Sequence, residues 1–143
     1  MEPESCFLCR KHRGLEEAPP GGYIYQDDCW MVCHAPVSKG PLGTLFLESR
    51  RHVLDFADLN DAEAKAFGSL VRHIYQVLRP LVGAERIYQV SMMEGLPHFH
   101  AWIVPRPKDI SERGIAFLAK DMVCGAGEAA ELAARLREAA QRW

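Results

Sequence analysis

The longest helical pattern in the chain runs from about residue 60 to residue 83. Its apolar residues recur every three or four positions, which is the spacing of a helix with one buried face. These residues are Phe67, Leu70, Val71, Ile74, Val77, Leu78 and Leu81. Asn60 is a favourable N-cap, and Glu63, three residues later, completes the pattern of a capping box. Pro80 and Gly83 predict the end of this helix.

Five shorter segments are typical of strands. They span residues 23–26, 29–34, 43–48, 86–93 and 98–105. A second amphipathic helix is expected over residues 126–143, with one face made of Leu132, Leu136, Ala140 and Trp143. The order of three strands, a helix, two strands and a helix predicts an α+β domain. We expect an antiparallel meander with the long helix packed on one face, followed by the C-terminal helix.

The last strand-like segment carries two histidines in alternating positions. In a strand, Phe99 and its apolar neighbours at positions 101 and 103 share one face, which suits packing against the long helix. His98, His100 and Trp102 lie on the opposite face. Two imidazoles fixed side by side can act as a nucleophile or base, or can bind a metal ion. The same pattern is equally consistent with two hydrogen-bonded packing residues, so the pair alone does not decide.

The composition favours one compact domain with no extended nucleic-acid surface. The chain has 143 residues, a formal net charge of -2 and a pI near 6.3, so it lacks a basic footprint. No apolar run approaches the length of a membrane span, and the first residues do not resemble a signal peptide. We therefore expect a cytoplasmic protein without membrane contact.

The odd count of five cysteines indicates free thiols rather than disulfides. Cys29, Cys33 and Cys124 are expected to be small buried apolar residues. Cys6 and Cys9 differ, because a C-x-x-C pair can chelate one metal ion from a single turn. The alternative, a redox motif, is disfavoured because the pair precedes the first strand instead of linking a strand to a helix.

A zinc ion held by Cys6 and Cys9 needs two further ligands. His52 and one of the strand histidines could supply them, which would complete a Cys₂His₂ set and make the zinc structural, not catalytic. Arg106, just beyond the histidines in "IVPRP", would place a cation near their face and is a candidate for substrate binding. The alternative is that Arg106 is a solvated loop residue.

Taken together, these segments resemble the histidine triad (HIT) superfamily of nucleotide hydrolases and transferases. "HFHAWIVPR" is similar to that family's motif of alternating histidines followed by two apolar residues and Pro-Arg. "CFLC" is similar to the C-x-x-C that opens many bacterial members, "YQDDCWMV" to their first strand turn, and "RRHVLDFADLNDAEA" to the segment that leads into their long helix. The resemblance covers residues 6–106.

The resemblance implies a five-stranded antiparallel sheet, usually in a homodimer, and a nucleotide phosphate site. It implies that His100 is the nucleophile and forms a nucleotidyl-histidine that water then cleaves. The metal ligands implied are Cys6, Cys9, His52 and His98, with Zn²⁺ in a structural role. The single domain 1–143 would comprise an N-terminal zinc-binding loop (1–22), the sheet and long helix (23–106), and a C-terminal helical extension (107–143).

The chain departs from the family pattern at several positions. Trp102 stands where the third histidine is expected, and its indole donates one hydrogen bond but carries no proton to a leaving group. Trp102 could stack on a base, or it could simply fill space. Leu96 and Pro97 offer no side-chain donor, and Thr44 stands where relatives often have another histidine. Three functions stay open: a nucleotide hydrolase or nucleotidyl transferase, a nucleotide-binding protein without turnover, and a zinc-stabilised interaction domain.

Overall fold

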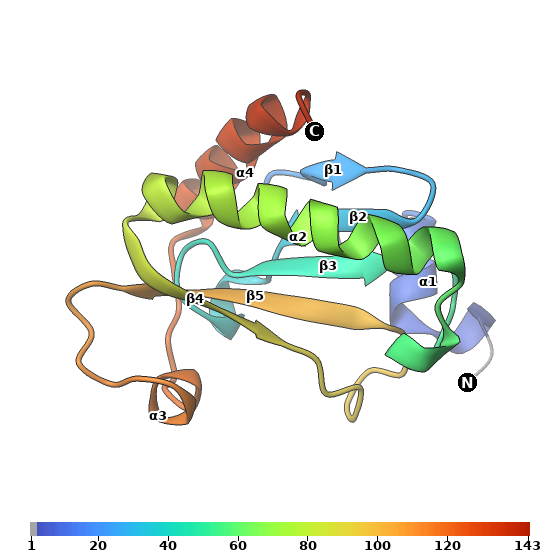
Figure 1. Cartoon of the computed structure of the whole chain (residues 1–143), viewed down its shortest axis with the longest axis horizontal. Helices are drawn as coiled ribbons and strands as arrows, with labels where there is room; N and C mark the ends of the chain where they lie inside the picture. The colour runs from blue at the N-terminus through green and yellow to red at the C-terminus, as the bar shows by residue number, and fades with distance from the viewer. Residues whose placement is uncertain (1–2) are drawn as a thin grey trace.

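The computed structural model describes residues 3–143, which form an α+β fold around one antiparallel sheet (Figure 1). The sheet has five strands in the order β1-β2-β3-β5-β4. Their bounds are Tyr25–Gln26 for β1, Trp30–His34 for β2, Leu45–Ser49 for β3, Ala84–Val90 for β4 and His100–Pro107 for β5. The predicted five-stranded antiparallel sheet, long helix and C-terminal helix are therefore confirmed.

The expected meander holds for β1 to β3 but is wrong beyond them, because β5 lies between β3 and β4. The helix α2 (Asp61–Val82) links β3 to β4. After this helix of 22 residues, β4 takes the edge position of the sheet, two places from β3. The hairpin that follows then brings β5 back into the gap, where it pairs with both β3 and β4.

The start of α2 follows the sequence pattern closely. The Asn60 side chain accepts the Glu63 N–H at 2.9 Å, and the Glu63 carboxylate accepts the Asn60 N–H at 2.8 Å, so the predicted capping box is confirmed. At the other end, Gly83 adopts a left-handed conformation (φ 63°) and terminates the helix. Pro80 lies in the last turn, and the helix ends two residues later at Val82, as the pair of Pro80 and Gly83 predicts.

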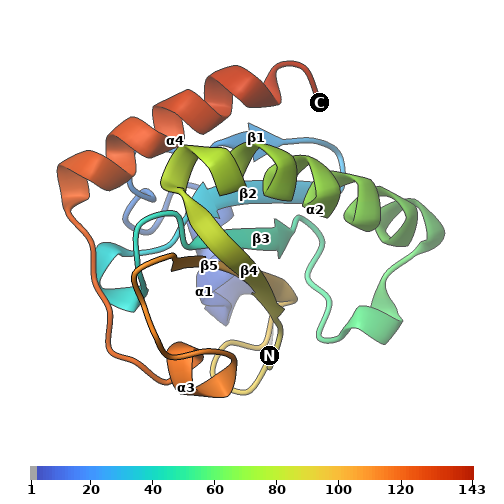
Figure 2. The ribbon, with the colours of Figure 1, turned by 60° about the vertical axis from the view of Figure 1, so that its left-hand side comes forward.

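The remaining helices lie on different sides of the sheet. Their bounds are Phe7–His12 for α1, Ile115–Leu118 for α3 and Ala126–Ala140 for α4, and short 3₁₀ turns span Pro3–Ser5, Val37–Lys39 and Phe56–Asp58. Figure 2 shows α2 and α4 together above the sheet and α1 beneath it. No helix of residues 3–143 is both long and apolar enough to span a bilayer.

The hydrophobic core lies between the sheet and the two long helices. Phe99, Ala101 and Ile103 belong to it, which confirms the face predicted for this segment. Leu132 and Leu136 bring α4 into the same core, and Trp143 packs against it through its contacts with Tyr25 and His73. The core thus occupies one face of the sheet. The opposite face, beneath which α1 lies, carries the polar residues described next.

Candidate metal centre and adjoining cavity

Four side chains from three parts of the chain bring their donor atoms together. The ligand atoms of Cys6, Cys9, His52 and His98 all lie within 4.8 Å of one another. The Cys6 Sγ–His98 Nδ1 and Cys9 Sγ–His52 Nδ1 distances are both 3.4 Å, and the two histidine Nδ1 atoms are 3.3 Å apart. A tetrahedron with Zn–S near 2.3 Å and Zn–N near 2.05 Å has S–N edges of about 3.5 Å and N–N edges of about 3.3 Å. The donor set therefore fits a tetrahedral zinc ion.

Local structure holds each of these donors in place. Cys6 is the N-cap of α1, where its Sγ accepts the Cys9 N–H at 3.5 Å, so one helical turn presents both thiols. His98 lies just before β5, and its Nε2–H donates to the Ser49 carbonyl at 2.7 Å. Because that proton occupies Nε2, the lone pair of Nδ1 points toward the cysteines, as a metal ligand requires.

The protonation of these groups also favours a cation between them. Burial, only partly offset by the hydrogen bond to the Ser49 carbonyl, lowers the pKa of His98 to about 4, so the ring is neutral and able to ligate. Burial, together with the hydrogen bond and charge of Cys6, raises the pKa of Cys9 to about 11. Two adjacent thiols resist ionising together unless a cation neutralises them. A zinc ion would supply that charge.

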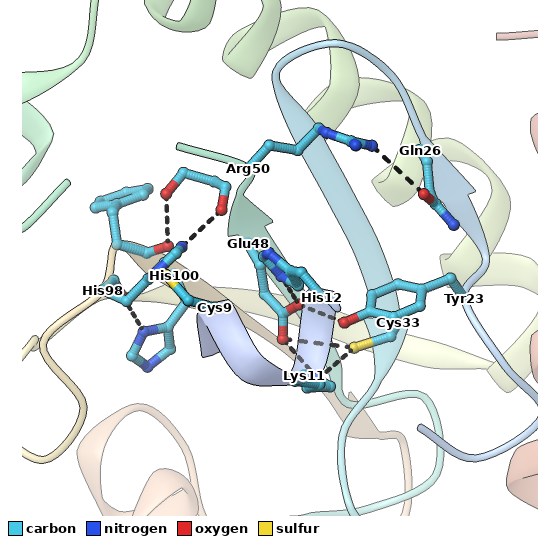
Figure 3. A network of polar contacts seen from close by, with 12 residues as sticks. Cys9, Lys11, His12, Tyr23, Gln26, Cys33, Glu48, Arg50, His98 and His100 are labelled. Atoms are coloured by element: carbon cyan, nitrogen blue, oxygen red, sulfur yellow. Dashed lines mark hydrogen bonds and ion pairs between the residues drawn. The ribbon is translucent and has the colours of Figure 1, made fainter. Parts of the chain in front are cut away.

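His100 sits at the first position of β5 and faces away from the core. Its Nδ1 lies 2.7 Å from the His98 carbonyl, which can only accept, so Nδ1 carries a proton and, in the neutral ring, the lone pair is on Nε2 (Figure 3). The ring is 8% exposed and contacts the edge of Phe46, with the ring centroids 6.1 Å apart. A neutral imidazole held in this tautomer is the form that acts as a nucleophile.

A cavity of about 970 Å³ opens over His100 and Trp102. This volume suits a nucleotide-sized ligand, since small-molecule sites commonly enclose about 300–1,000 Å³. Its walls are mainly apolar and include Phe7, Phe46 and Met92, and Ala126 and Ala130 of α4 also line it. Phe46 and Trp102 meet edge to face with ring centroids 4.7 Å apart, so the indole forms part of an aromatic wall.

Arg106 does not border this cavity. It lies inside β5, where it pairs in register with Arg86, and it is only 3% exposed, so the alternative of a solvated loop residue is wrong. Its guanidinium faces Glu85 at 3.8 Å and donates to the Ile110 carbonyl at 3.5 Å. The strand continues through Pro107, which carries Arg106 away from the histidines. Its assignment to substrate binding stays a prediction that the position of the cavity does not support.

Two further polar side chains, His34 and Thr44, form hydrogen bonds with the backbone. His34 borders the cavity, but its Nδ1–H donates to the Ala35 carbonyl at 2.7 Å and its Nε2 accepts the Gly43 N–H at 3.0 Å. Thr44 donates to the Pro41 carbonyl at 2.7 Å and is buried. These contacts hold the connection between β2 and β3 and occupy both ring nitrogens of His34 and the hydroxyl proton of Thr44.

A buried acid, Glu48, forms the polar centre that sequence patterns did not reveal. It is fully buried on β3 and is the cross-strand partner of His100. Lys11 Nζ approaches one carboxylate oxygen at 2.7 Å, and His12 Nε2 and the Tyr23 hydroxyl approach the other at 2.9 and 3.0 Å. Figure 3 shows these side chains converging on Glu48. Burial would raise the pKa of Glu48, but the His12 hydrogen bond and the Lys11 charge outweigh it and keep the pKa below its usual value.

The three cysteines outside the metal centre fit the prediction only in part. Cys33 is fully buried, yet it lies in a polar setting, 3.3 Å from Lys11 Nζ and 3.7 Å from Glu48. Cys29 and Cys124 are half-buried, so the prediction of buried apolar residues is wrong for them. Cys29 precedes β2 at the turn made by Asp27, and Cys124 lies in the loop before α4, where the chain runs near the surface.

Comparison with known proteins gives a consistent answer on fold. No protein-family model matches the chain, and no curated protein shows significant sequence similarity to it. A zinc-bound histidine triad family protein from Mycobacterium smegmatis superposes with a TM-score of 0.75, at 18% identity over 99% of this chain and 96% of that chain. This chain has the fold of the histidine triad proteins.

Two other solved structures agree over nearly the whole chain. A Hit-like protein involved in cell-cycle regulation from Bartonella henselae gives a TM-score of 0.74 at 14% identity, covering 97% of this chain and 99% of that one. A hypothetical histidine triad nucleotide-binding protein from Sulfolobus tokodaii gives 0.73 at 14% identity, covering 96% and 93%. At these identities the likeness concerns the fold, and function has to be argued from the site.

Proposed function

We propose that this chain is a member of the HIT superfamily that hydrolyses a nucleotide phosphoester or phosphoanhydride, or transfers the nucleotidyl group, through His100. The observation that carries the proposal is the geometry at His100. Its Nδ1 proton is fixed by the His98 carbonyl, and its ring borders a nucleotide-sized cavity. The solved structures with this fold include one described as a nucleotide-binding protein.

In this mechanism the lone pair on His100 Nε2 attacks the α-phosphorus of the ligand. A phosphorus–nitrogen bond forms while the bond to the leaving group breaks, and the leaving group departs with the electron pair and takes up a proton. Water then attacks the nucleotidyl-histidine, which returns His100 to its starting state and releases a nucleoside monophosphate. An alcohol or phosphate in place of water would make the same step a transfer. Positioning is the main contribution of the protein in such chemistry.

The proposed Zn²⁺ has a structural role. Cys6, Cys9, His52 and His98 would hold it, and four protein ligands leave no open coordination position for a substrate. The ion would join α1 to the start of β5 and fix the peptide whose carbonyl orients His100. The zinc-bound neighbour of the same fold supports this assignment. We further expect, from the resemblance, a homodimer in the cytoplasm, and sedimentation velocity can test the dimer.

Trp102 is proposed as the wall on which a base or other flat group packs. It stands where a proton-carrying third histidine is expected, and an indole cannot protonate a leaving group. This favours ligands whose leaving group departs without help, and it also keeps the second candidate function open. That candidate is a protein with the same zinc and cavity that binds a nucleotide without turning it over.

A substrate panel separates the two candidates. Adenosine phosphoramidate, a dinucleoside polyphosphate and a nucleotide sugar are incubated with the wild-type protein, with His100→Ala and with the control His73→Ala, and products are resolved by chromatography. We expect nucleoside monophosphate from the wild type and the control but not from His100→Ala. Tight nucleotide binding by all three proteins with no product would favour the binding protein. Absence of both binding and product would leave the zinc-stabilised interaction domain.

A further inference from the structure

The cavity over His100 has few cations on its wall. Among the described residues that border it, the positive side chains are Lys11 and Lys39, whereas Glu17, Glu48 and Glu94 are acidic. Lys39 is exposed at the end of a 3₁₀ turn, but the side chain of Lys11 is only 8% exposed. An anionic ligand that reaches His100 therefore meets one fixed, largely desolvated cation, where a charge interacts more strongly than at the surface.

Lys11 is held from several sides. Its Nζ donates to Glu48 at 2.7 Å and to Cys33 at 3.3 Å, and it lies over the rings of Tyr23 and Phe46 at 5.4 and 5.7 Å from their centroids. An ammonium group has three N–H donors, and these two hydrogen bonds use two of them. The third donor can serve a ligand without breaking either hydrogen bond.

The same residues that hold Lys11 place it near His100. Glu48 is the cross-strand partner of His100, so the two side chains stand beside each other on one face of the sheet. Phe46 contacts both groups, with its ring centroid 6.1 Å from that of His100 and 5.7 Å from Lys11 Nζ. Figure 3 shows Glu48 between His100 and Lys11, with α1 carrying Lys11 across this face. The ammonium and the imidazole thus border the same part of the cavity.

We infer that Lys11 binds the phosphoryl group of the ligand that reaches His100, with Glu48 as the residue that positions it. The inference rests on the proposed function and adds a positively charged contact for the anion, which Trp102, Leu96 and Pro97 cannot provide. A lysine suits this role because its compact ammonium acts on phosphate oxygens as a point charge. Glu48 keeps the side chain in one rotamer, so little conformational freedom is lost when the ligand binds.

The test compares a ligand that has the phosphoryl group with one that lacks it. Binding of AMP and of adenosine is followed by NMR titration, which also detects weak affinity, for the wild type, Lys11→Met and the control Lys39→Met. Loss of one charge-assisted hydrogen bond typically costs about 10- to 100-fold in affinity. We expect Lys11→Met to weaken AMP binding by that factor and to leave adenosine binding unchanged, while Lys39→Met changes both by less than threefold, about 0.65 kcal/mol.

A second variant addresses folding, because Lys11→Met leaves the Glu48 carboxylate buried without its cation. The double variant Lys11→Met/Glu48→Gln removes both charges, and the amide signals of its NMR spectrum report whether the fold is intact. We expect it to show the same loss of preference for AMP over adenosine, and we expect Lys11→Arg to keep the preference. Undiminished AMP binding by Lys11→Met, or by the double variant Lys11→Met/Glu48→Gln, would overturn the inference while leaving the proposed function standing. A wild type that binds neither ligand would overturn both.

Discussion

Replacing Glu48 with glutamine should strongly destabilise this fold. The substitution keeps the shape of the side chain but removes the charge that neutralises Lys11, and it places an amide donor where the carboxylate now accepts from Lys11, His12 and Tyr23. Glu48 is fully buried and the Lys11 side chain is nearly so, so water cannot substitute for the lost interactions.

The size of the effect follows from the burial of this pair. Removing one partner of a buried ion pair typically costs about 3–5 kcal/mol, because the other charge stays uncompensated in a low-dielectric setting. For a domain of this length, each kcal/mol lowers the melting temperature by about 2–4 °C, which gives a decrease of about 6–20 °C.

Urea unfolding followed by circular dichroism measures the free energy of unfolding of the wild type, Glu48→Gln, Lys11→Met and the double variant. The double variant should lose less stability than the two single losses added together, because removing both charges leaves neither unpaired. Glu112→Gln is the matched control, since Glu112 pairs with Lys120 at the surface and its loss should leave the melting temperature nearly unchanged. If Glu48→Gln unfolds at the same urea concentration as this control, the charge cluster does not stabilise the fold as argued.

The remaining predictions concern the metal and pH. The purified protein should hold one zinc per chain by elemental analysis, and Cys6→Ser/Cys9→Ser should lose it; unchanged zinc in that variant would remove the site. Removing the metal with a chelator should weaken AMP binding, although the zinc would not touch the ligand, because α1 carries both Cys9 and Lys11. Equal AMP affinity with and without the metal would show that the metal centre does not position Lys11. Folded-state pKa values below the unfolded ones make stability fall as pH decreases. The free energy of unfolding of the metal-free protein should therefore decrease as pH falls from about 6.5 toward 4, because the folded state lowers the pKa of His98 to about 4. Below about pH 4.3 the free energy of unfolding should decrease further as Glu48, whose pKa is lowered in the folded state, becomes protonated. A melting temperature that does not change over this range would contradict both shifts.

The parts of the fold that were predictable are those encoded by neighbouring residues. The capping box at Asn60 and the spacing of the apolar residues that follow it define α2 without reference to the rest of the chain. The alternation around Phe99 separates the core face of β5 from the histidine face. The C-x-x-C pair indicated a metal site, for which His52 and one of the strand histidines were candidate ligands, and the resemblance selected His98 as the fourth ligand.

The parts that were missed depend on how distant segments pack. After α2 the chain forms the edge strand β4, and β5 then pairs with both β3 and β4; no local pattern specifies this order. From the sequence alone, Glu48 is expected to be a charged residue at the end of an apolar strand. Its role emerges only when α1 brings Lys11 and His12 onto the same face. The position of Arg106 was misjudged for a related reason, since β5 extends past the expected strand end.

The central claim is that His100 becomes covalently bound to a nucleotidyl group. Rapid acid-free quenching after mixing the protein with adenosine phosphoramidate, followed by intact-mass measurement and peptide mapping, tests it directly. We expect an added adenylyl mass on the peptide that contains His100, absent from His100→Ala and retained in His73→Ala. An adduct on another residue, or product formed at the wild-type rate by His100→Ala, would contradict it.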